Sequence, residues 1–165
     1  MADDFSPSNL SKDQIAVLAD HFAQKNEYRP GDDIRAFVQK IGGTIDYTNS
    51  AADSFGGSLD VKGGKISIHL SRFTNPARDN FTIAHELGHY VLHSRCGKLD
   101  IHAGRTDSRN KCEAEANYFA ACFLMPEEAF RTSHKKDSNI YSLADAFNVS
   151  LSAVQIRCQS LNLPL

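Results

Sequence analysis

The sequence contains no long hydrophobic run, no large excess of charge of one sign and no paired cysteine motif. No apolar stretch is long enough to cross a bilayer, and no signal-peptide core follows the N-terminus. The net charge of −2 gives no electrostatic case for binding nucleic acid or membranes. The four cysteines form no C-x-x-C pair, which argues against a zinc knuckle and for free thiols. We therefore expect a cytoplasmic protein.

The most informative feature that is present is the pentapeptide His85-Glu86-Leu87-Gly88-His89, which has the form H-E-x-x-H. Two histidines four residues apart project from one face of a helix, so both imidazoles can bind one metal ion. A glutamate beside the first histidine can reach a water molecule activated by the metal and act as its general base. Because histidines on a helix are often ordinary core or surface residues, the surrounding pattern decides the interpretation.

The pattern around the pentapeptide predicts an amphipathic helix with His85 and His89 on its polar side. The residues on the opposite, apolar side are Ile83, Ala84, Leu87, Tyr90 and Val91. His93 continues the histidine row but lies about 12 Å along the helix axis from His85. Since metal–nitrogen bonds are about 2 Å long, we predict that His93 is a helix-end histidine stabilised by the helix dipole and not a ligand.

A catalytic zinc site normally has three protein ligands and one open position. The residues after His89 do not match the pattern that places a third histidine shortly downstream, so we expect a carboxylate from a later helix. Residues 111–125 form the strongest helical pattern in the chain. Periodicity puts Glu113 on its inward face and Glu115 on the opposite side, so Glu113 is the predicted ligand; the alternative is a solvated carboxylate. Asn117, one turn further, is placed to orient a neighbouring ligand.

Three motifs occur together: H-E-L-G-H at 85–89, E-x-E-A-N-x-F-A at 113–120 and L-M-P at 124–126. In this combination the chain resembles the ImmA/IrrE family of metallopeptidases over roughly its central third. The resemblance implies a compact, thermolysin-like zinc-peptidase core. It also implies cleavage of helix-turn-helix repressors of the Xre type, which relieves repression of mobile elements or stress genes.

The resemblance also assigns roles to individual residues. His85, His89 and Glu113 correspond to the metal ligands, and Glu86 corresponds to the catalytic base. Asn117 takes the place of the polar residue one turn after the glutamate in related zinc peptidases. The expected metal is zinc, although manganese could occupy the same ligands because availability as well as affinity decides occupancy.

The remaining sequence predicts an α+β fold with a small mixed or antiparallel sheet, a zincin-like active-site helix and a helical C-terminal part. We expect residues 1–10 to form a flexible arm and residues 11–165 to form a single zinc metallopeptidase domain. Cap and stop signals predict helices at 11–26 and 32–41. Strands are predicted at 44–48, 57–61 and 65–70, with the last two joined as a hairpin by Gly63-Gly64.

Two segments near the predicted metal helix are candidates for contact with a substrate. The strand at 65–70 could be an edge on which a peptide adds as an extra strand, contacting Ser67 and His69; the alternative is an ordinary sheet edge. The polar segment 94–110 is long enough to indicate a functional loop. Within it, His102 is a candidate for stabilising the oxyanion of the transition state, and the alternative is a solvated loop.

Residues 138–162 have the pattern of a helix, a tight turn at Asn148, a cap at Ser150 and a second helix, as in a helix-turn-helix. The second helix offers Gln155 and Arg157 but few flanking cations. We therefore predict that this pair packs against the core and does not contact DNA.

The motifs predict a zinc-dependent endopeptidase, and the resemblance implies that its partner is a helix-turn-helix repressor. Two alternatives stay open. A non-catalytic, metal-dependent anti-repressor would bind the repressor without cleaving it, and a DNA-binding regulator would use the C-terminal helices. We expect no membrane partner and no direct contact with nucleic acid.

Overall fold

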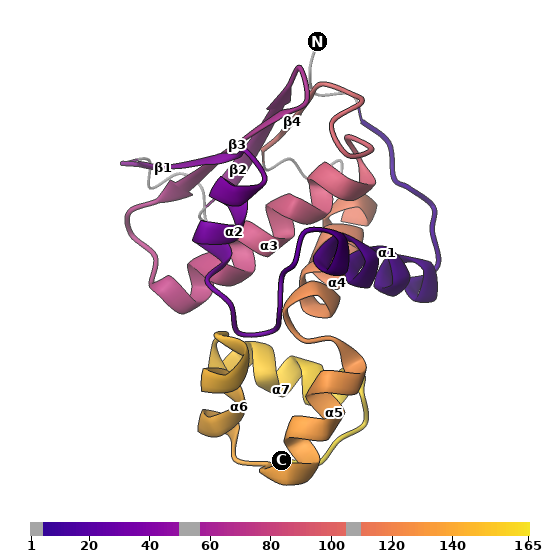
Figure 1. Ribbon diagram of the computed structural model, residues 1–165, viewed down its shortest axis with the longest axis vertical. Coiled ribbons are helices and arrows are strands. Elements are labelled where there is room, and N and C mark those ends of the chain that lie inside the picture. The colour runs from indigo at the N-terminus through magenta and orange to yellow at the C-terminus, as the bar shows by residue number, and fades with distance from the viewer. Residues whose placement is uncertain (1–4, 50–56, 105–109) are drawn as a thin grey trace.

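The computed structural model describes residues 5–49, 57–104 and 110–165, in which helices lie beneath a small sheet (Figure 1). The helices are α1 (Lys12–Lys25), α2 (Ile34–Lys40), α3 (Pro76–Leu92), α4 (Asn110–Leu124), α5 (Glu127–Lys136), α6 (Ile140–Phe147) and α7 (Leu151–Ser160). The strands are β1 (Thr44–Thr48), β2 (Gly57–Lys62), β3 (Lys65–Ser71) and β4 (Ile101–Ala103). The prediction of an α+β fold is confirmed. Within these ranges, no helix has the length and apolar character needed to cross a membrane.

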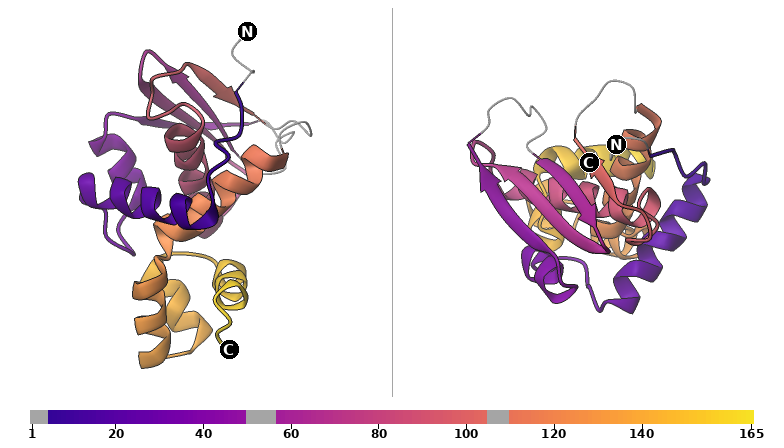
Figure 2. Two further views of the ribbon diagram at one scale, coloured as in Figure 1. Left: turned by 90° about the vertical axis from the view of Figure 1, so that its right-hand side faces the viewer. Right: turned by 90° about the horizontal axis from the view of Figure 1, so that it is seen from above.

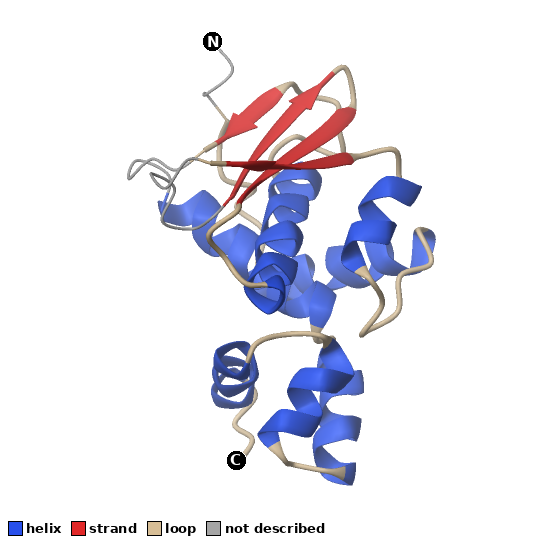
Figure 3. Ribbon diagram, turned by 90° about the vertical axis from the view of Figure 1, so that its left-hand side faces the viewer, coloured by secondary structure: helices blue, strands red, loops and turns tan. Residues whose placement is uncertain are grey.

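The sheet has the strand order β1-β3-β2-β4. Strand β1 runs parallel to β3, and β2 runs antiparallel to both β3 and β4. Alternating side chains of β2 and β3, among them Leu59, Val61 and Ile68, are buried. They face the helices, which lie on one side of the sheet (Figure 3). The other side is polar, and no helix of the described ranges covers it (Figure 2).

The sheet differs from the prediction in two ways. Strand β3 is hydrogen-bonded to β1 on one side and to β2 on the other, so its interpretation as a substrate-binding edge is wrong. The segment predicted as a loop contains β4, which pairs with β2 and forms an edge. A strand of three residues is too short to show an alternating pattern. Strand order depends on pairing between distant segments, which local patterns do not encode.

Local signals for helix ends agree well with the structure. At the start of α1, Ser11 and Gln14 form the predicted capping box. Between α6 and α7, Asn148 adopts the left-handed conformation with φ 56°, and Ser150 caps α7 by accepting the N–H of Ala153. The predicted helix-turn-helix pattern is thus present. Helix α5, which begins directly after Pro126, has no counterpart in the prediction.

Helices α5, α6 and α7 form a group below α3 and α4 (Figures 1 and 2). Inside the group, the rings of Phe130 and Phe147 pack with their centroids 5.2 Å apart. Helix α7 ties the group to the upper part, because the Arg157 guanidinium donates a hydrogen bond to the carbonyl of Met125 at 3.0 Å. Arg157 is only 3% exposed. The buried Arg157 side chain therefore links α7 to the end of α4.

Residues 5–10 lie against the rest of the chain. The backbone N–H and the hydroxyl of Ser8 donate hydrogen bonds to the Glu115 carboxylate at 2.9 and 2.5 Å. The Phe5 ring stacks on His93 with the centroids 5.3 Å apart. The predicted flexible arm therefore does not extend through residues 5–10, and residues 1–4 lie outside the described ranges.

Candidate metal centre

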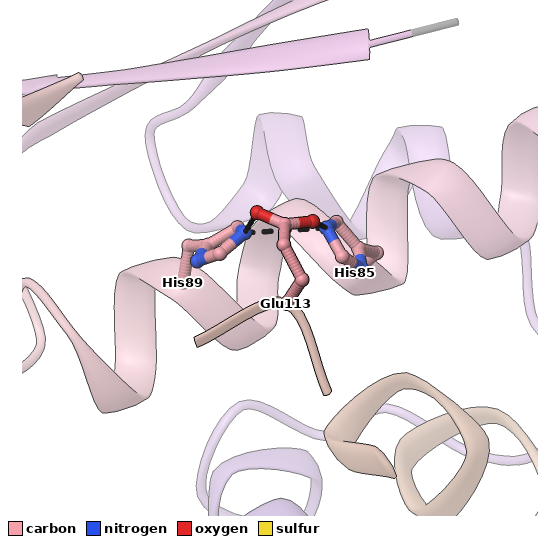
Figure 4. Close-up of side chains that lie close together, drawn as sticks. All are labelled: His85, His89 and Glu113. Carbon is pink, nitrogen blue, oxygen red and sulfur yellow. Dashed lines mark hydrogen bonds and ion pairs between the residues drawn. The ribbon is translucent and has the colours of Figure 1, made fainter. Parts of the chain in front are cut away.

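Helix α3 carries the H-E-x-x-H residues and has a clear start. The Asn75 side chain accepts the N–H of Arg78, and Pro76 stands in the first turn, where a backbone N–H has no partner within the helix. Ile83 and Leu87 are fully buried. Burial of this side fixes the rotation of α3, so that His85 and His89 project toward α4 (Figure 4).

Gly88 allows α3 and α4 to approach closely. A β-carbon at this position would lie 3.0 Å from both the Cα and the carbonyl oxygen of Ala116, and 3.2 Å from the Cβ of Phe119. These atoms belong to the backbone or adjoin it, so side-chain rotation cannot move them aside. The absence of a side chain at Gly88 thus lets Glu113 of α4 reach the histidines of α3.

His85, His89 and Glu113 converge at one point, as the sequence predicts (Figure 4). The Glu113 oxygens lie 2.9 Å from Nε2 of His85 and 3.1 Å from Nε2 of His89. The two Nε2 atoms are 3.2 Å apart. Two imidazole nitrogens and a carboxylate oxygen are a donor set that suits zinc. The three side chains lie close enough to form a metal site.

Burial and mutual contact set the protonation of these groups. Burial lowers the pKa of His89 to about 4, although only a protonated Nε2 could donate a hydrogen bond to Glu113. Burial opposes ionisation of Glu113, but the two histidines in contact with its carboxylate hold its pKa well below the usual value. A carboxylate and a neutral imidazole are the forms that bind metals. Burial would lower the pKa of His85, but Glu113 and Glu86 raise it above the usual value.

Each histidine makes a further contact through its other ring nitrogen. Nδ1 of His85 lies 2.8 Å from Oδ1 of Asn117, the residue placed by the sequence one turn after Glu113. Nδ1 of His89 lies 2.8 Å from Nδ1 of His93. His93 stays outside the group of three ligands, but it is buried. His93 is the C-cap residue of α3, so the prediction of a helix-end histidine that is not a ligand is confirmed; in addition, His93 packs behind His89.

A cleft of about 700 Å³ opens beside the metal centre. Glu86 and His85 line it, and Glu86 is only 3% exposed. Tyr118 of α4 also lines the cleft. The opposite wall includes Ala153 and Ile156 of α7. The sequence predicts that the C-terminal helices pack against the core, but it does not predict that they line this cleft.

The remaining candidates lie away from this cleft. Ile101 and Ala103 of β4 are buried in the core, so His102 between them faces the polar side of the sheet. There its Nδ1 lies 2.6 Å from Asp60, whose carboxylate also contacts His69. His102 is thus not placed to stabilise an oxyanion at the metal centre. Ser67 and His69 share that outer side, and Ser67 contacts Thr44.

Comparison with known proteins agrees with this geometry. Residues 42–159 match the family Peptidase_M78, described as the IrrE N-terminal-like domain. The chain belongs to this family. The match covers α3, α4 and all three residues of the metal centre. No curated protein matches the chain.

A solved structure shares the fold of this Peptidase_M78 member. It is described as a Mycobacterium tuberculosis transcriptional regulator, with a TM-score of 0.62 and 19% sequence identity. The similarity covers 94% of the present chain and 48% of the regulator. The chain therefore spans about half the length of that protein, and the likeness concerns the fold alone.

Proposed function

We propose that this protein is a zinc-dependent endopeptidase that cleaves a helix-turn-helix repressor of the Xre type. Such cleavage would relieve repression of a stress response or a mobile element. The observation that carries the proposal is the convergence of His85, His89 and Glu113 at the edge of a cleft that Glu86 also lines. Membership of a metallopeptidase family supports the same reaction.

In this proposal His85, His89 and Glu113 hold the metal. When bound, zinc supplies a Lewis acid that activates water and polarises a carbonyl oxygen. The mixed nitrogen and oxygen donors fit zinc, and manganese remains an alternative. Asn117 accepts the Nδ1–H of His85, which leaves Nε2 of that ring with the lone pair needed for coordination.

Glu86 acts as the general base and then as the general acid. Its carboxylate takes a proton from the attacking water as the carbon–oxygen bond forms at the scissile carbonyl. It then passes that proton to the leaving amine as the carbon–nitrogen bond breaks. Burial of Glu86 beside the cleft favours such transfers because few water molecules compete.

The cleft supports a protein chain as the substrate. Its lining includes the exposed side chain of Ile156 and, on the other side, the partly buried Phe81, while Arg78 and Lys12 add cations. The fold similarity to a transcriptional regulator supports a role in transcription. Direct DNA binding by α7 is less well supported, since Arg157, the cation of that helix, is buried against Met125.

The Glu86→Gln variant tests the reaction. Purified zinc-loaded protein and the variant are each incubated with the repressor encoded beside the gene, and products are separated by mass. We expect a discrete fragment with the wild type only, while zinc and repressor binding remain in both. If Glu86→Gln relieves repression as fully as the wild type, the protein acts by sequestration and the peptidase proposal is lost.

A further inference from the structure

Behind His89, a buried chain of hydrogen bonds leads to the N-terminal segment. His93 lies 2.8 Å from His89 between Nδ1 atoms, and its Nε2 lies 3.0 Å from Oε1 of Glu115. Ser8 donates its N–H and its hydroxyl to that carboxylate. His93 and Glu115 are 2% and 6% exposed, so water does not compete for these contacts.

The chemistry of this chain fixes the tautomer of each imidazole. An ionised carboxylate can only accept hydrogen bonds, so Nε2 of His93 carries the proton that it donates to Glu115. A neutral His93 then has a lone pair at Nδ1. The short contact between the rings therefore requires that Nδ1–H of His89 is the donor. This leaves Nε2 of His89 with a lone pair directed toward Glu113.

We propose that His93 and Glu115 are positioning residues that hold His89 in the tautomer and orientation needed to bind the metal. The inference rests on the metal centre of the proposed function. Ligand histidines in metal sites usually donate their second N–H to a carboxylate, a carbonyl or water. Here the acceptor of the His89 N–H is another imidazole, that of His93. The carboxylate of Glu115 accepts the N–H of His93 in turn.

The N-terminal segment belongs to this support. Phe5 stacks on the ring of His93 and makes a T-shaped contact with the ring of His89 at a centroid distance of 5.6 Å. Ser8 occupies both oxygens of Glu115 and so fixes the side-chain orientation of the carboxylate. The segment thus covers both His93 and Glu115.

The matched pair His93→Asn and His93→Leu tests the proposal on the full chain. The two new side chains have nearly the same shape, and both remove the imidazole ring and the contact with Glu115. Only asparagine retains an oxygen near the place of Nδ1, where it can accept the N–H of His89. We expect zinc affinity to fall about 10- to 100-fold in His93→Leu and clearly less in His93→Asn.

Zinc affinity is measured by competition with a chelating dye, and the visible spectrum of bound Co²⁺ reports the ligand geometry. Thermal unfolding of the metal-free proteins separates folding from positioning. Equal zinc affinity in wild type, His93→Asn and His93→Leu would overturn the proposal. The proposal would also be overturned if both variants lost the same zinc affinity and this loss matched their loss of stability without metal. If the wild type itself binds no zinc, the proposed metal centre fails, and this inference fails with it.

Glu115→Leu provides a second test if the His93 variants unfold. Without the carboxylate, nothing obliges His93 to carry its proton on Nε2, so its other tautomer competes and can no longer accept from His89. We expect a loss of zinc affinity and a changed Co²⁺ spectrum. Phe130→Leu, a core change among α5–α7, serves as a control. It lowers stability without changing any residue of the hydrogen-bonded series His89–His93–Glu115. If Glu115→Leu binds zinc as well as that control does, the positioning role is refuted.

Discussion

Gly88 offers a sharp test of the packing that builds the metal centre. In a helix interior, glycine to alanine normally stabilises by about 0.5–1 kcal/mol, because alanine loses less backbone entropy. Here the added β-carbon would meet two backbone atoms of Ala116 at 3.0 Å. Forcing extra volume into a packed core costs about 1–3 kcal/mol. We therefore expect Gly88→Ala to lower the free energy of unfolding by about 1 kcal/mol, equivalent to about 2–4 °C in Tm.

Urea denaturation of metal-free protein measures this change. The difference between Val17→Ala and Val17→Gly, at a position 66% exposed on α1, gives the alanine–glycine term without any clash. Zinc affinity should fall with stability in Gly88→Ala, because separation of α3 and α4 moves Glu113 away from His89. The sign of the change in unfolding free energy decides between the two outcomes. If Gly88→Ala stabilises by as much as alanine exceeds glycine at position 17, α3 and α4 are not in the close contact described above.

Two further predictions concern the metal and the outer side of the sheet. Glu113→Gln should remove most of the zinc-dependent stabilisation, which is about 2.7 kcal/mol in the wild type at a zinc concentration 100 times Kd. Thermal unfolding with zinc and with a chelator measures this stabilisation. If zinc raises the Tm of Glu113→Gln as much as that of the wild type, the prediction is contradicted. Burial opposes protonation of His69, but Asp46 and Asp60 raise its pKa, so its contribution is full below about pH 6.5 and is lost as pH rises through the higher folded pKa. His69→Gln should therefore destabilise more at pH 6 than at pH 8 in denaturant titrations. Equal losses at both values would contradict the stabilisation of protonated His69 by Asp46 and Asp60.

Local sequence patterns predict those parts of the site that short-range geometry controls. The spacing of His85 and His89 places both on one face because a helix has 3.6 residues per turn. Periodicity also selects Glu113 over Glu115 as the carboxylate near the histidines, in agreement with the structure. Neither step requires knowledge of distant segments.

Parts of the site that depend on tertiary contacts escape the same reasoning. The strand at Lys65–Ser71 alternates well, but its inner place in the sheet results from pairing with β1 and β2. The wall that α7 contributes to the cleft results from the docking of Arg157 on Met125. No local pattern encodes either arrangement, since each one joins segments that are distant in the sequence.

The burial of Glu115 and the failure of the prediction of a flexible N-terminal arm have one shared cause. Periodicity assigns Glu115 to the side of α4 away from Glu113, and that side would be solvated if residues 5–10 were flexible. In the structure those residues cover it, with Ser8 on the carboxylate and Phe5 on His93. A charged side chain is buried only when it is paired. Burial of Glu115 therefore requires both Ser8 and His93, which makes the N-terminal segment part of the support of the metal centre.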